Sequence, residues 1–271
     1  MPFFDTHTHS DALLHELGLT LGAFLKECER VQIAKIMVMG TSKRNFSPIL
    51  SLCEKAPTVL LPALGLHPLY IQQHQKADLD QLEKLIQTGA LAAIGEIGLE
   101  RYIRELTIDQ WWFAQCAYFE AQLQLASHHQ LPVSIHARKA HNEVYRFLKN
   151  SKVQGVIHGF SGSLQEAMRY VDLGFKIGVG GTITYLRASK TRETIARLPL
   201  NSLVLETDSP DMPIAQRPGQ LNRPVNLVFI FQALCEIRSE PCELLATQLW
   251  HNSEAVFICL LYTSDAADEG L

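Results

Sequence analysis

Short apolar runs alternate with longer amphipathic stretches along nearly the whole chain. Strands are predicted at eight apolar runs: Phe3–Thr6, Lys35–Met39, Val59–Leu64, Ala92–Ile97, Pro132–Ile135, Gly155–Ile157, Phe175–Val179 and Ser202–Leu205. Helices are predicted near residues 20–31, 44–56, 78–88, 107–128, 140–149, 163–173, 188–198, 223–238 and 241–257. Several strands are continuously apolar, which is typical of parallel strands buried on both faces. Such strand–helix units, repeated over about 250 residues, predict an α/β fold, a closed TIM-like (β/α)8 barrel.

A doubly wound open sheet is the competing architecture. It would normally use fewer strands and carry a glycine-rich fingerprint after the first one, whereas His7-Thr8-His9 stands at that position here. No Pro-, Gly- or Ser-rich linker interrupts the pattern, so residues 1–258 are predicted to form a single barrel domain.

The final segment, residues 259–271, does not continue the amphipathic pattern that precedes it. It resembles the translation of a transposase sequencing adapter, and we interpret it as a non-native tail. A natural disordered tail is the alternative. Genomic resequencing of the 3′ end distinguishes the two.

The composition narrows the classes of function. The chain has 271 residues, of which 47% are hydrophobic, and its 24 Lys and Arg against 28 Asp and Glu give a net charge of −4. This excludes a protein that holds nucleic acid through a broadly basic surface. A signal peptide and an apolar run of about 18 residues are both missing, so we expect a cytoplasmic protein without membrane association. The 6 cysteines form no CxxC pair and are expected to be reduced packing thiols.

Metal-binding side chains follow or end several of the predicted strands. The first strand closes on Asp5-Thr-His-Thr-His9, and side chains two residues apart on an extended chain share one face. Similar positions elsewhere hold Glu96, His136, His158 and Asp208. Alone, each has an ordinary explanation, such as a core histidine, a buried ion-pair partner or a turn residue.

As a set, these groups point to metal, because the carboxyl ends of barrel strands converge on one mouth. The predicted ligands are His7, His9, Glu96, His136, His158 and Asp208. That number exceeds what one catalytic zinc needs and suits two divalent ions that share a carboxylate. The abundance of imidazole favours zinc, manganese or iron over magnesium, although geometry and supply can override that preference.

The same residues belong to motifs that resemble those of the TatD family of metal-dependent hydrolases, within the amidohydrolase-like barrels. The matching stretches, in family order, are Asp5-Thr-His-Thr-His9, Gly65-Leu-His-Pro68, Gly95-Glu-Ile-Gly-Leu99, His136-Ala-Arg138, His158-Gly-Phe-Ser-Gly162, Gly178-Val-Gly-Gly-Thr182, Glu206-Thr-Asp-Ser-Pro210 and Asn222-Arg-Pro224. The resemblance implies a TIM-like barrel, divalent cations and DNase activity, with 3′ exonuclease action on single strands in some members. It also implies the six ligands already named. Glu100 stands where the family usually has Asp, which puts metal affinity and substrate choice in question.

Roles follow for the candidate catalytic residues. We expect His7, His9 and Asp208 on one ion, His136 and His158 on the other, and Glu96 as the bridge. Asp208 would also align the attacking water and receive its proton. No Gly-x-Ser-x-Gly elbow supports a serine nucleophile.

Four residues are predicted to contact substrate, each with an alternative. His67 either binds phosphate or donates a proton, or it forms a structural turn. Arg138 either grips a phosphate or makes a surface ion pair. Ser161 lies in a turn that can present N–H groups to an anion, with Ser163 as the helix N-cap. Arg223 either reaches the site or lies on the surface, with Pro224 at the start of the last barrel helix.

Aromatic residues in the predicted strand-end loops are candidate stacking platforms for bases. They are Tyr70, Phe160 and Tyr185, and the alternative for each is an ordinary core or rim position.

The function predicted from these residues is hydrolysis of single-stranded DNA, or RNA, from the 3′ end by a two-metal centre. The low net charge favours a short footprint on single strands, because two dications supply positive charge at the centre itself. Deacylation of D-aminoacyl-tRNA or cleavage of another carbonyl substrate is one alternative. A catalytically inert metal-loaded binding protein is another. No obligate protein partner is expected.

Overall fold

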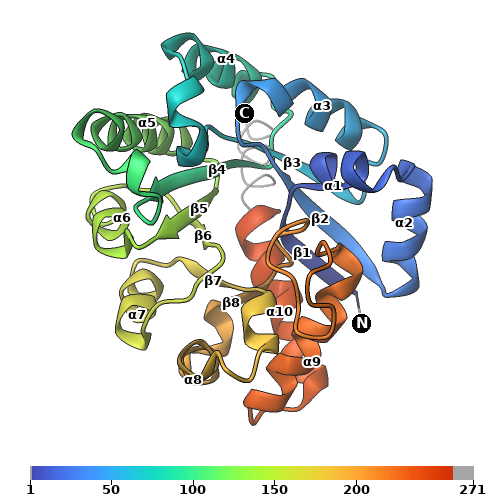
Figure 1. The fold of residues 1–271 in the computed structure, drawn as a ribbon. Helices are drawn as coiled ribbons and strands as arrows, with labels where there is room; N and C mark the ends of the chain where they lie inside the picture. Colours follow the sequence, from blue (N-terminus) through green and yellow to red (C-terminus); the bar gives the residue numbers. More distant parts are fainter. Residues whose placement is uncertain (1, 259–271) are drawn as a thin grey trace, which may run out of the picture.

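The computed structural model describes residues 2–258, so the tail predicted at 259–271 lies outside the described residues. Eight parallel strands pair in the order β1 to β8 and form a nearly closed barrel (Figure 1). The strands are β1 (Phe3–Thr8), β2 (Ile33–Met39), β3 (Leu60–Leu64), β4 (Ala93–Glu100), β5 (Val133–Arg138), β6 (Gly155–Ile157), β7 (Lys176–Val179) and β8 (Leu203–Leu205). The predicted (β/α)8 barrel is confirmed.

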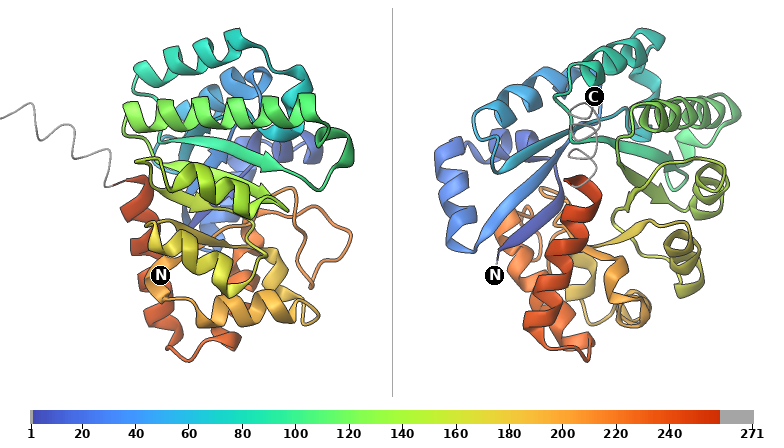
Figure 2. Two further views of the ribbon diagram at one scale, coloured as in Figure 1. Left: turned by 90° about the vertical axis from the view of Figure 1, so that its left-hand side faces the viewer. Right: turned by 180° about the vertical axis from the view of Figure 1, so that it is seen from behind.

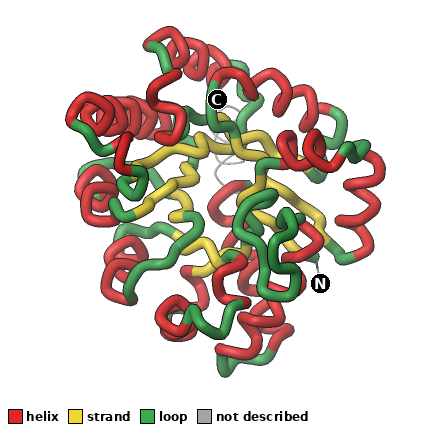
Figure 3. The backbone as a smooth tube through the Cα atoms, in the orientation of Figure 1, coloured by secondary structure: helices red, strands yellow, loops and turns green. Residues whose placement is uncertain are grey.

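Helices surround the strands, as the tube drawing in Figure 3 shows. They are α1 (Ser10–Leu17), α2 (Leu21–Arg30), α3 (Lys43–Glu54), α4 (Lys76–Gln87), α5 (Asp109–His128), α6 (His141–Leu148), α7 (Leu164–Asp172), α8 (Ser189–Arg197), α9 (Leu227–Ile237) and α10 (Cys242–Phe257). Short 3-10 helices are η1 (Pro68–Gln73), η2 (Arg104–Leu106), η3 (Gly181–Thr184), η4 (Leu200–Ser202) and η5 (Pro224–Asn226).

The barrel closes where its first and last strands meet. One isolated bridge joins Thr8 to Ser209, and the hydroxyl of Thr6 donates to the carbonyl oxygen of Leu205 at 2.9 Å. The N–H of Asp208 donates to the carbonyl oxygen of His7 at 2.9 Å. This seam therefore places the residues after β8 beside those of β1.

Two apolar clusters fill the fold. The larger lies between the strands and the surrounding helices, while the smaller fills the barrel with Phe4, Met37, Met39 and Val204. Phe257 of α10 belongs to the smaller cluster and is fully buried, with its ring centroid 6.1 Å from that of Phe4. Seen from behind, α10 crosses the barrel (Figure 2). The apolar packing thus occupies one end of the barrel and leaves the carboxyl ends of the strands for polar chemistry.

Most element predictions agree with the structure to within a few residues, and four differ. The eight-residue helix α1 was not predicted, β1 continues past Thr6 to Thr8, β4 continues past Ile97 to Glu100, and β5 continues past Ile135 to Arg138. A strand need not end at a polar side chain if that side chain finds a hydrogen-bond partner within the fold. Here the hydroxyl of Thr8 donates to the carbonyl oxygen of Met37 at 3.0 Å, so the strand can run on. Within residues 2–258, no helix has both the length and the apolar character that crossing a bilayer requires.

Candidate metal centre

Glu96 lies at the middle of the predicted ligand cluster, and its two carboxylate oxygens face different histidines. Oε2 is 3.2 Å from Nε2 of His7 and 3.4 Å from Nε2 of His9. Oε1 is 2.6 Å from Nε2 of His158 and 3.1 Å from Nδ1 of His136. The two sides of one carboxylate therefore each have a separate pair of imidazoles.

Asp208 joins the first of these pairs. Its Oδ1 lies 3.5 Å from Nε2 of His7 and 3.6 Å from Nε2 of His9. The structure thus gathers all six predicted ligands at the carboxyl ends of β1, β4, β5, β6 and β8. The rings of His7 and His158 also stack, with their centroids 3.9 Å apart, and the division of the ligands between two ions stays a prediction.

Asp5 positions this arrangement, a role that sequence analysis did not assign. Its buried carboxylate accepts hydrogen bonds from the N–H of Thr207 at 2.9 Å and from the hydroxyl of Thr207 at 2.6 Å. The backbone next to Asp208 is thereby tied to the strand that carries His7. The acid at the start of the His-Thr-His motif was the available signal.

Outer hydrogen bonds orient three of the rings. Nδ1 of His7 lies 2.9 Å from the hydroxyl of Ser134, and Nδ1 of His9 lies 3.2 Å from the carbonyl oxygen of Met39. Contacts of this kind fix the tautomer of a ligating histidine and leave its other nitrogen free for a cation.

His136 has the strongest outer partner. Its Nε2 lies 3.2 Å from Oε2 of the buried Glu100, whose Oε1 accepts the N–H of Tyr102 at 2.5 Å. Between the two glutamates, Gly98 lets β4 approach β5 closely, because a Cβ there would lie 2.0 Å from the carbonyl oxygen of His136. The extension of β4 to Glu100 therefore places this carboxylate behind His136.

His67 is oriented as a hydrogen-bond donor and not as a ligand. It caps η1, because its Nδ1 accepts the N–H of Leu69 at 3.1 Å. The neutral ring must then carry its proton on Nε2, which lies 2.9 Å from Oε1 of Glu96. Proximity alone also groups His67 with Glu96 and His136, but a protonated Nε2 has no lone pair to offer a cation. This geometry is compatible with both roles considered for His67, the structural turn and a place in the site.

Burial and charge set the protonation of the cluster. Burial lowers the pKa of His7 and of His67 to about 4, so both rings are neutral at pH 7. Burial opposes ionisation of Glu96, but the neighbouring imidazoles, His158 foremost, hold the pKa of Glu96 well below its usual range. Burial likewise opposes ionisation of Asp208, and the hydrogen bond from His9 overrides it and lowers the pKa of Asp208. The ligand set thus contains two carboxylates that are charged at neutral pH.

This donor set fits divalent cations. No Lys or Arg among residues 2–258 lies within 4.0 Å of the carboxylate oxygens of Glu96 or Asp208. His7, His9 and Glu96 each offer one ligand atom, and these atoms lie within 4.8 Å of one another. Burial opposes protonation of His158 and His9, but Glu96 and Asp208 raise the pKa of His158 to about 9 and that of His9 well above its usual value. Protonated imidazoles therefore balance the two carboxylates in the metal-free protein, and bound dications would replace those protons.

Glu206 is a further buried acid that sequence analysis quoted only as part of a motif. Its Oε1 accepts the N–H of Gly159 at 2.5 Å, while its Oε2 and Nδ1 of His158 are buried without a hydrogen-bond partner. Burial raises the pKa of Glu206 to about 7. Its signal was an acid directly after the apolar run of β8.

A cavity of about 710 Å³ opens over the cluster, and most of the predicted substrate contacts lie on it. Its lining includes His67, Arg138, Ser161 and Tyr70. The guanidinium of Arg138 stacks on Tyr102, with Cζ 4.0 Å from the ring centroid. Ser163, as predicted, caps the next helix by accepting the N–H of Glu166.

For two residues the structure decides between the alternatives that the sequence left open. Arg223 forms an ion pair with Glu27 of α2 and does not line the cavity, because the loop before α9 directs its side chain outward. Phe160 is a core residue that is only 3% exposed, with its ring centroid 5.1 Å from that of His141, so it offers no open face to a base.

The comparisons with known proteins agree with this geometry. The family model described as TatD related DNase matches residues 4–258. The chain belongs to the TatD family. A metal-dependent hydrolase of Haemophilus influenzae is 48% identical over 95% of this chain and 100% of its own length. The crystal structure of YjjV, a TatD homologue from Escherichia coli K12, superposes with a TM-score of 0.87 at 42% identity and covers 94% of this chain and 97% of its own.

A third relative carries a more specific name. A protein of Pantoea sp. strain At-9b, called 3'-5' ssDNA/RNA exonuclease TatD, is 30% identical over 89% of this chain and 97% of its own length. As a member of the TatD family, the chain studied here is a metal-dependent hydrolase that acts on ester bonds.

Proposed function

We propose that the chain is a two-metal phosphodiesterase that removes nucleotides from the 3′ end of single-stranded DNA, with RNA as a second substrate. The observation that carries the proposal is the division of the site by Glu96, whose two oxygens face separate ligand sets. A bridging carboxylate between paired sites is the arrangement that clamps a phosphodiester. The name of the Pantoea relative supports the choice of substrate.

The residues are assigned to the ions as follows. His7, His9 and Asp208 would hold one cation, His136 and His158 would hold the other, and Glu96 would bridge them. When bound, such a pair of ions acidifies water and neutralises charge on the phosphate; zinc, manganese and magnesium are the candidates.

The chain's own groups perform the remaining steps. Asp208 is ionised, lies at the mouth, and can orient the attacking water and accept its proton. His67 presents the N–H of its Nε2 to the same space, where it can donate a hydrogen bond to a phosphate oxygen and keep its proton. Arg138 supplies a guanidinium for a second phosphate oxygen.

The charges around the mouth favour a short footprint. Arg138 lines the cavity on the β5 side, whereas Asp11, Glu16 and Asp211 line it on the side of α1 and the loop after β8. An extended duplex would meet these acids, while the end of a single strand can approach past Arg138. A cytoplasmic location and action without an obligate partner stay predictions.

The test uses chelated protein reloaded with Mg²⁺, Mn²⁺ or Zn²⁺ and a single-stranded oligonucleotide labelled at its 5′ end. A ladder that shortens stepwise from the 3′ end is expected, and Glu96→Gln should abolish it. Hydrolysis of D-aminoacyl-tRNA or of a simple ester with an intact oligonucleotide would favour a carbonyl substrate. A fully metal-loaded protein without turnover on any of these would overturn an enzymatic role.

A further inference from the structure

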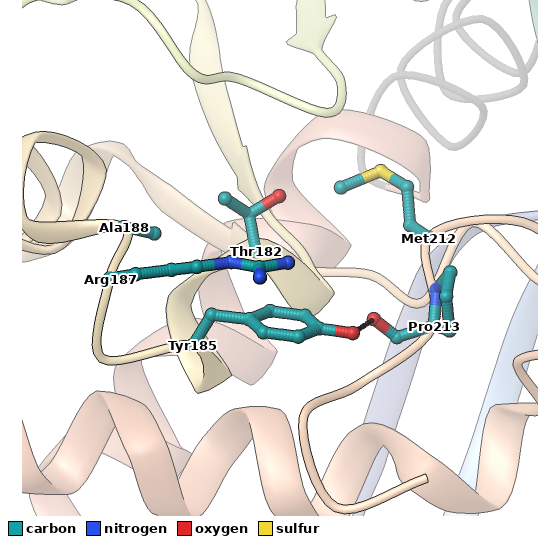
Figure 4. A pocket seen from close by; sticks show the side chains of 6 residues that line it. All are labelled: Thr182, Tyr185, Arg187, Ala188, Met212 and Pro213. Atoms are coloured by element: carbon teal, nitrogen blue, oxygen red, sulfur yellow. Dashed lines mark hydrogen bonds between the residues drawn. The ribbon is translucent and has the colours of Figure 1, made fainter. Parts of the chain in front are cut away.

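A second, smaller hollow adjoins the cavity of the metal centre. It measures about 310 Å³ and is lined by Thr182, Tyr185, Arg187, Ala188, Met212 and Pro213 (Figure 4). Thr182 and Met212 line both spaces, so the hollow continues the cavity beyond the carboxyl end of β7. Nothing in the assigned metal site uses the other residues of this hollow.

Arg187 is the charged group of the hollow. Its side chain extends over the ring of Tyr185 (Figure 4), with Cζ 5.0 Å from the ring centroid. Within residues 2–258 no carboxylate lies within 4.0 Å of its guanidinium nitrogens. The neighbouring Arg192 contrasts with it, because that side chain donates to the carbonyl oxygen of Ile183 and pairs with Glu236. Arg192 therefore supports the fold, while the donors of Arg187 remain available to a ligand.

Tyr185 is held as a fixed platform beneath this guanidinium. Its hydroxyl donates to the carbonyl oxygen of Pro213 at 2.9 Å, the dashed contact in Figure 4. The hydrogen bond ties the segment after β7 to the loop after β8 and keeps the hollow open between them. An arginine stacked on an aromatic ring is preorganised, so it loses less side-chain entropy when it binds an anion.

The charges of the mouth connect Arg187 with the metal centre. Arg138 on β5 and Arg187 beyond β7 lie on one arc of the barrel rim, whereas Asp11 and Glu16 lie on α1. A polyanion bound at the centre is repelled by Asp11 and Glu16 of α1 and by Asp211 of the loop after β8, and it is attracted by the two arginines on the arc from β5 to β7. The hollow lies at the Arg187 end of this arc.

We propose that the hollow is a subsite for the nucleotide next to the scissile linkage. Arg187 binds the phosphodiester of that nucleotide, and the apolar wall of Met212 and Pro213 contacts its sugar and base. This inference rests on the proposed phosphodiesterase function and adds to it a site that distinguishes a polynucleotide from a small diester.

The test compares Arg187→Ala with a matched control, Arg197→Ala. Arg187 precedes α8 and Arg197 ends it, and the side chain of Arg197 pairs with Glu193 at the surface. The substrates are oligo(dT) and bis(p-nitrophenyl) phosphate, a small diester without a neighbouring nucleotide. For Arg187→Ala, the ratio of KM for oligo(dT) to KM for the small diester should rise about tenfold, as expected for the loss of one charge-assisted hydrogen bond.

A binding measurement separates this subsite from catalysis. Fluorescence anisotropy of labelled phosphorothioate oligo(dT), which resists hydrolysis, with metal-loaded protein should show weaker binding for Arg187→Ala. The slope of log K against log salt should fall by about 0.7, the value for one phosphate contact on a single strand. Arg197→Ala should change neither quantity.

The outcomes keep the two proposals apart. If wild-type protein degrades oligo(dT) but Arg187→Ala leaves the KM ratio and the salt slope unchanged, the subsite is refuted and the phosphodiesterase stands. If wild-type protein cleaves only the small diester or a carboxylic ester, both proposals fall.

Discussion

The carboxylate of Glu100 lies 3.2 Å from Nε2 of His136, whose opposite nitrogen, Nδ1, is 3.1 Å from Glu96. An acid on one ring nitrogen fixes the proton there and frees the other nitrogen for a cation. The hydrogen bond from His136 outweighs burial and lowers the pKa of Glu100, so this acid is charged at neutral pH. Glu100, which replaces the usual aspartate of the family, thus determines which face of His136 reaches the centre.

Replacing Glu100 by Gln should weaken metal binding. An amide N–H that donates to Nε2 of His136 forces the ring proton onto Nδ1 and removes the lone pair that faces Glu96. We expect a 10- to 100-fold loss of affinity, the usual effect of losing such an outer partner, measured by isothermal titration with Mn²⁺ or Zn²⁺. Glu100→Asp keeps the charge and should lose less. Unchanged affinity in Glu100→Gln would show that His136 is not a ligand through Nδ1.

His67→Leu separates hydrogen-bond donation from metal binding. Because Nε2 of His67 carries a proton and has no lone pair for a cation, the variant should retain the metal content of the wild type. Its kcat should fall about 10²- to 10³-fold, the range for the loss of one hydrogen-bond donor that stabilises developing charge in the transition state. Metal content by mass spectrometry and steady-state rates on an oligonucleotide measure the two effects. His136→Leu is the matched control and should lose metal, and a similar loss in His67→Leu would make His67 a ligand.

Arg138 and Arg223 should behave oppositely. Arg138→Ala should raise KM for an oligonucleotide about tenfold, because a charge-assisted contact to phosphate is lost. Arg223→Ala should leave KM unchanged and lower the free energy of unfolding by about 0.2–1 kcal/mol, as is typical of a partly exposed ion pair. Glu27→Gln should reproduce the second result in chemical denaturation. A raised KM in Arg223→Ala would return that residue to the site.

The cysteines should differ sharply in reactivity. Burial raises the pKa of Cys28 and of Cys53 to about 12, whereas Cys242 is exposed. At pH 8, iodoacetamide should label Cys242 and spare the two buried thiols until denaturant is added, as peptide mapping can show. Rapid labelling of Cys28 in the folded protein would contradict this.

The same thiols predict a decline of stability at high pH. A thiol of the unfolded chain ionises near pH 8.5, whereas the folded protein holds the proton of Cys28 to about pH 12. The stabilisation that the buried, protonated thiols give to the folded protein is therefore complete below about pH 8.5. It is lost as the pH rises from about 8.5 toward the pKa of the folded state. Tm measured for the wild type and for Cys28→Ala at pH 8 and pH 10.5 tests the sign, because the wild type should lose more.

The fold was predictable from sequence because buried parallel strands are continuously apolar. Boundaries failed where partners far away in the chain satisfy polar groups. Thr8 extends β1 because its hydroxyl reaches the carbonyl oxygen of Met37. Helix α1 was missed because its eight residues are too few to show a clear apolar periodicity.

The ligand cluster was predictable because strand ends of a barrel converge, so position alone brings the six side chains together. Asp5, Glu100 and Glu206 received no definite role because their functions depend on partners such as Thr207 and His136. The positions of Arg223 and Phe160 stayed open between two alternatives, because the path of a loop sets the direction of its side chains and the local pattern does not encode that path.

The seam between β1 and β8 makes the candidate site depend on both ends of the chain. His7 and His9 are made first and Asp208 near the end, and Asp5 reaches Thr207 across a separation of 202 residues. A fragment that ends before β8 keeps both imidazoles but lacks the acid beside them. Under the proposed ligand assignment, hydrolytic competence would therefore begin only when the ring of strands is complete, and a cation held on both sides of the seam would join the two ends of the barrel.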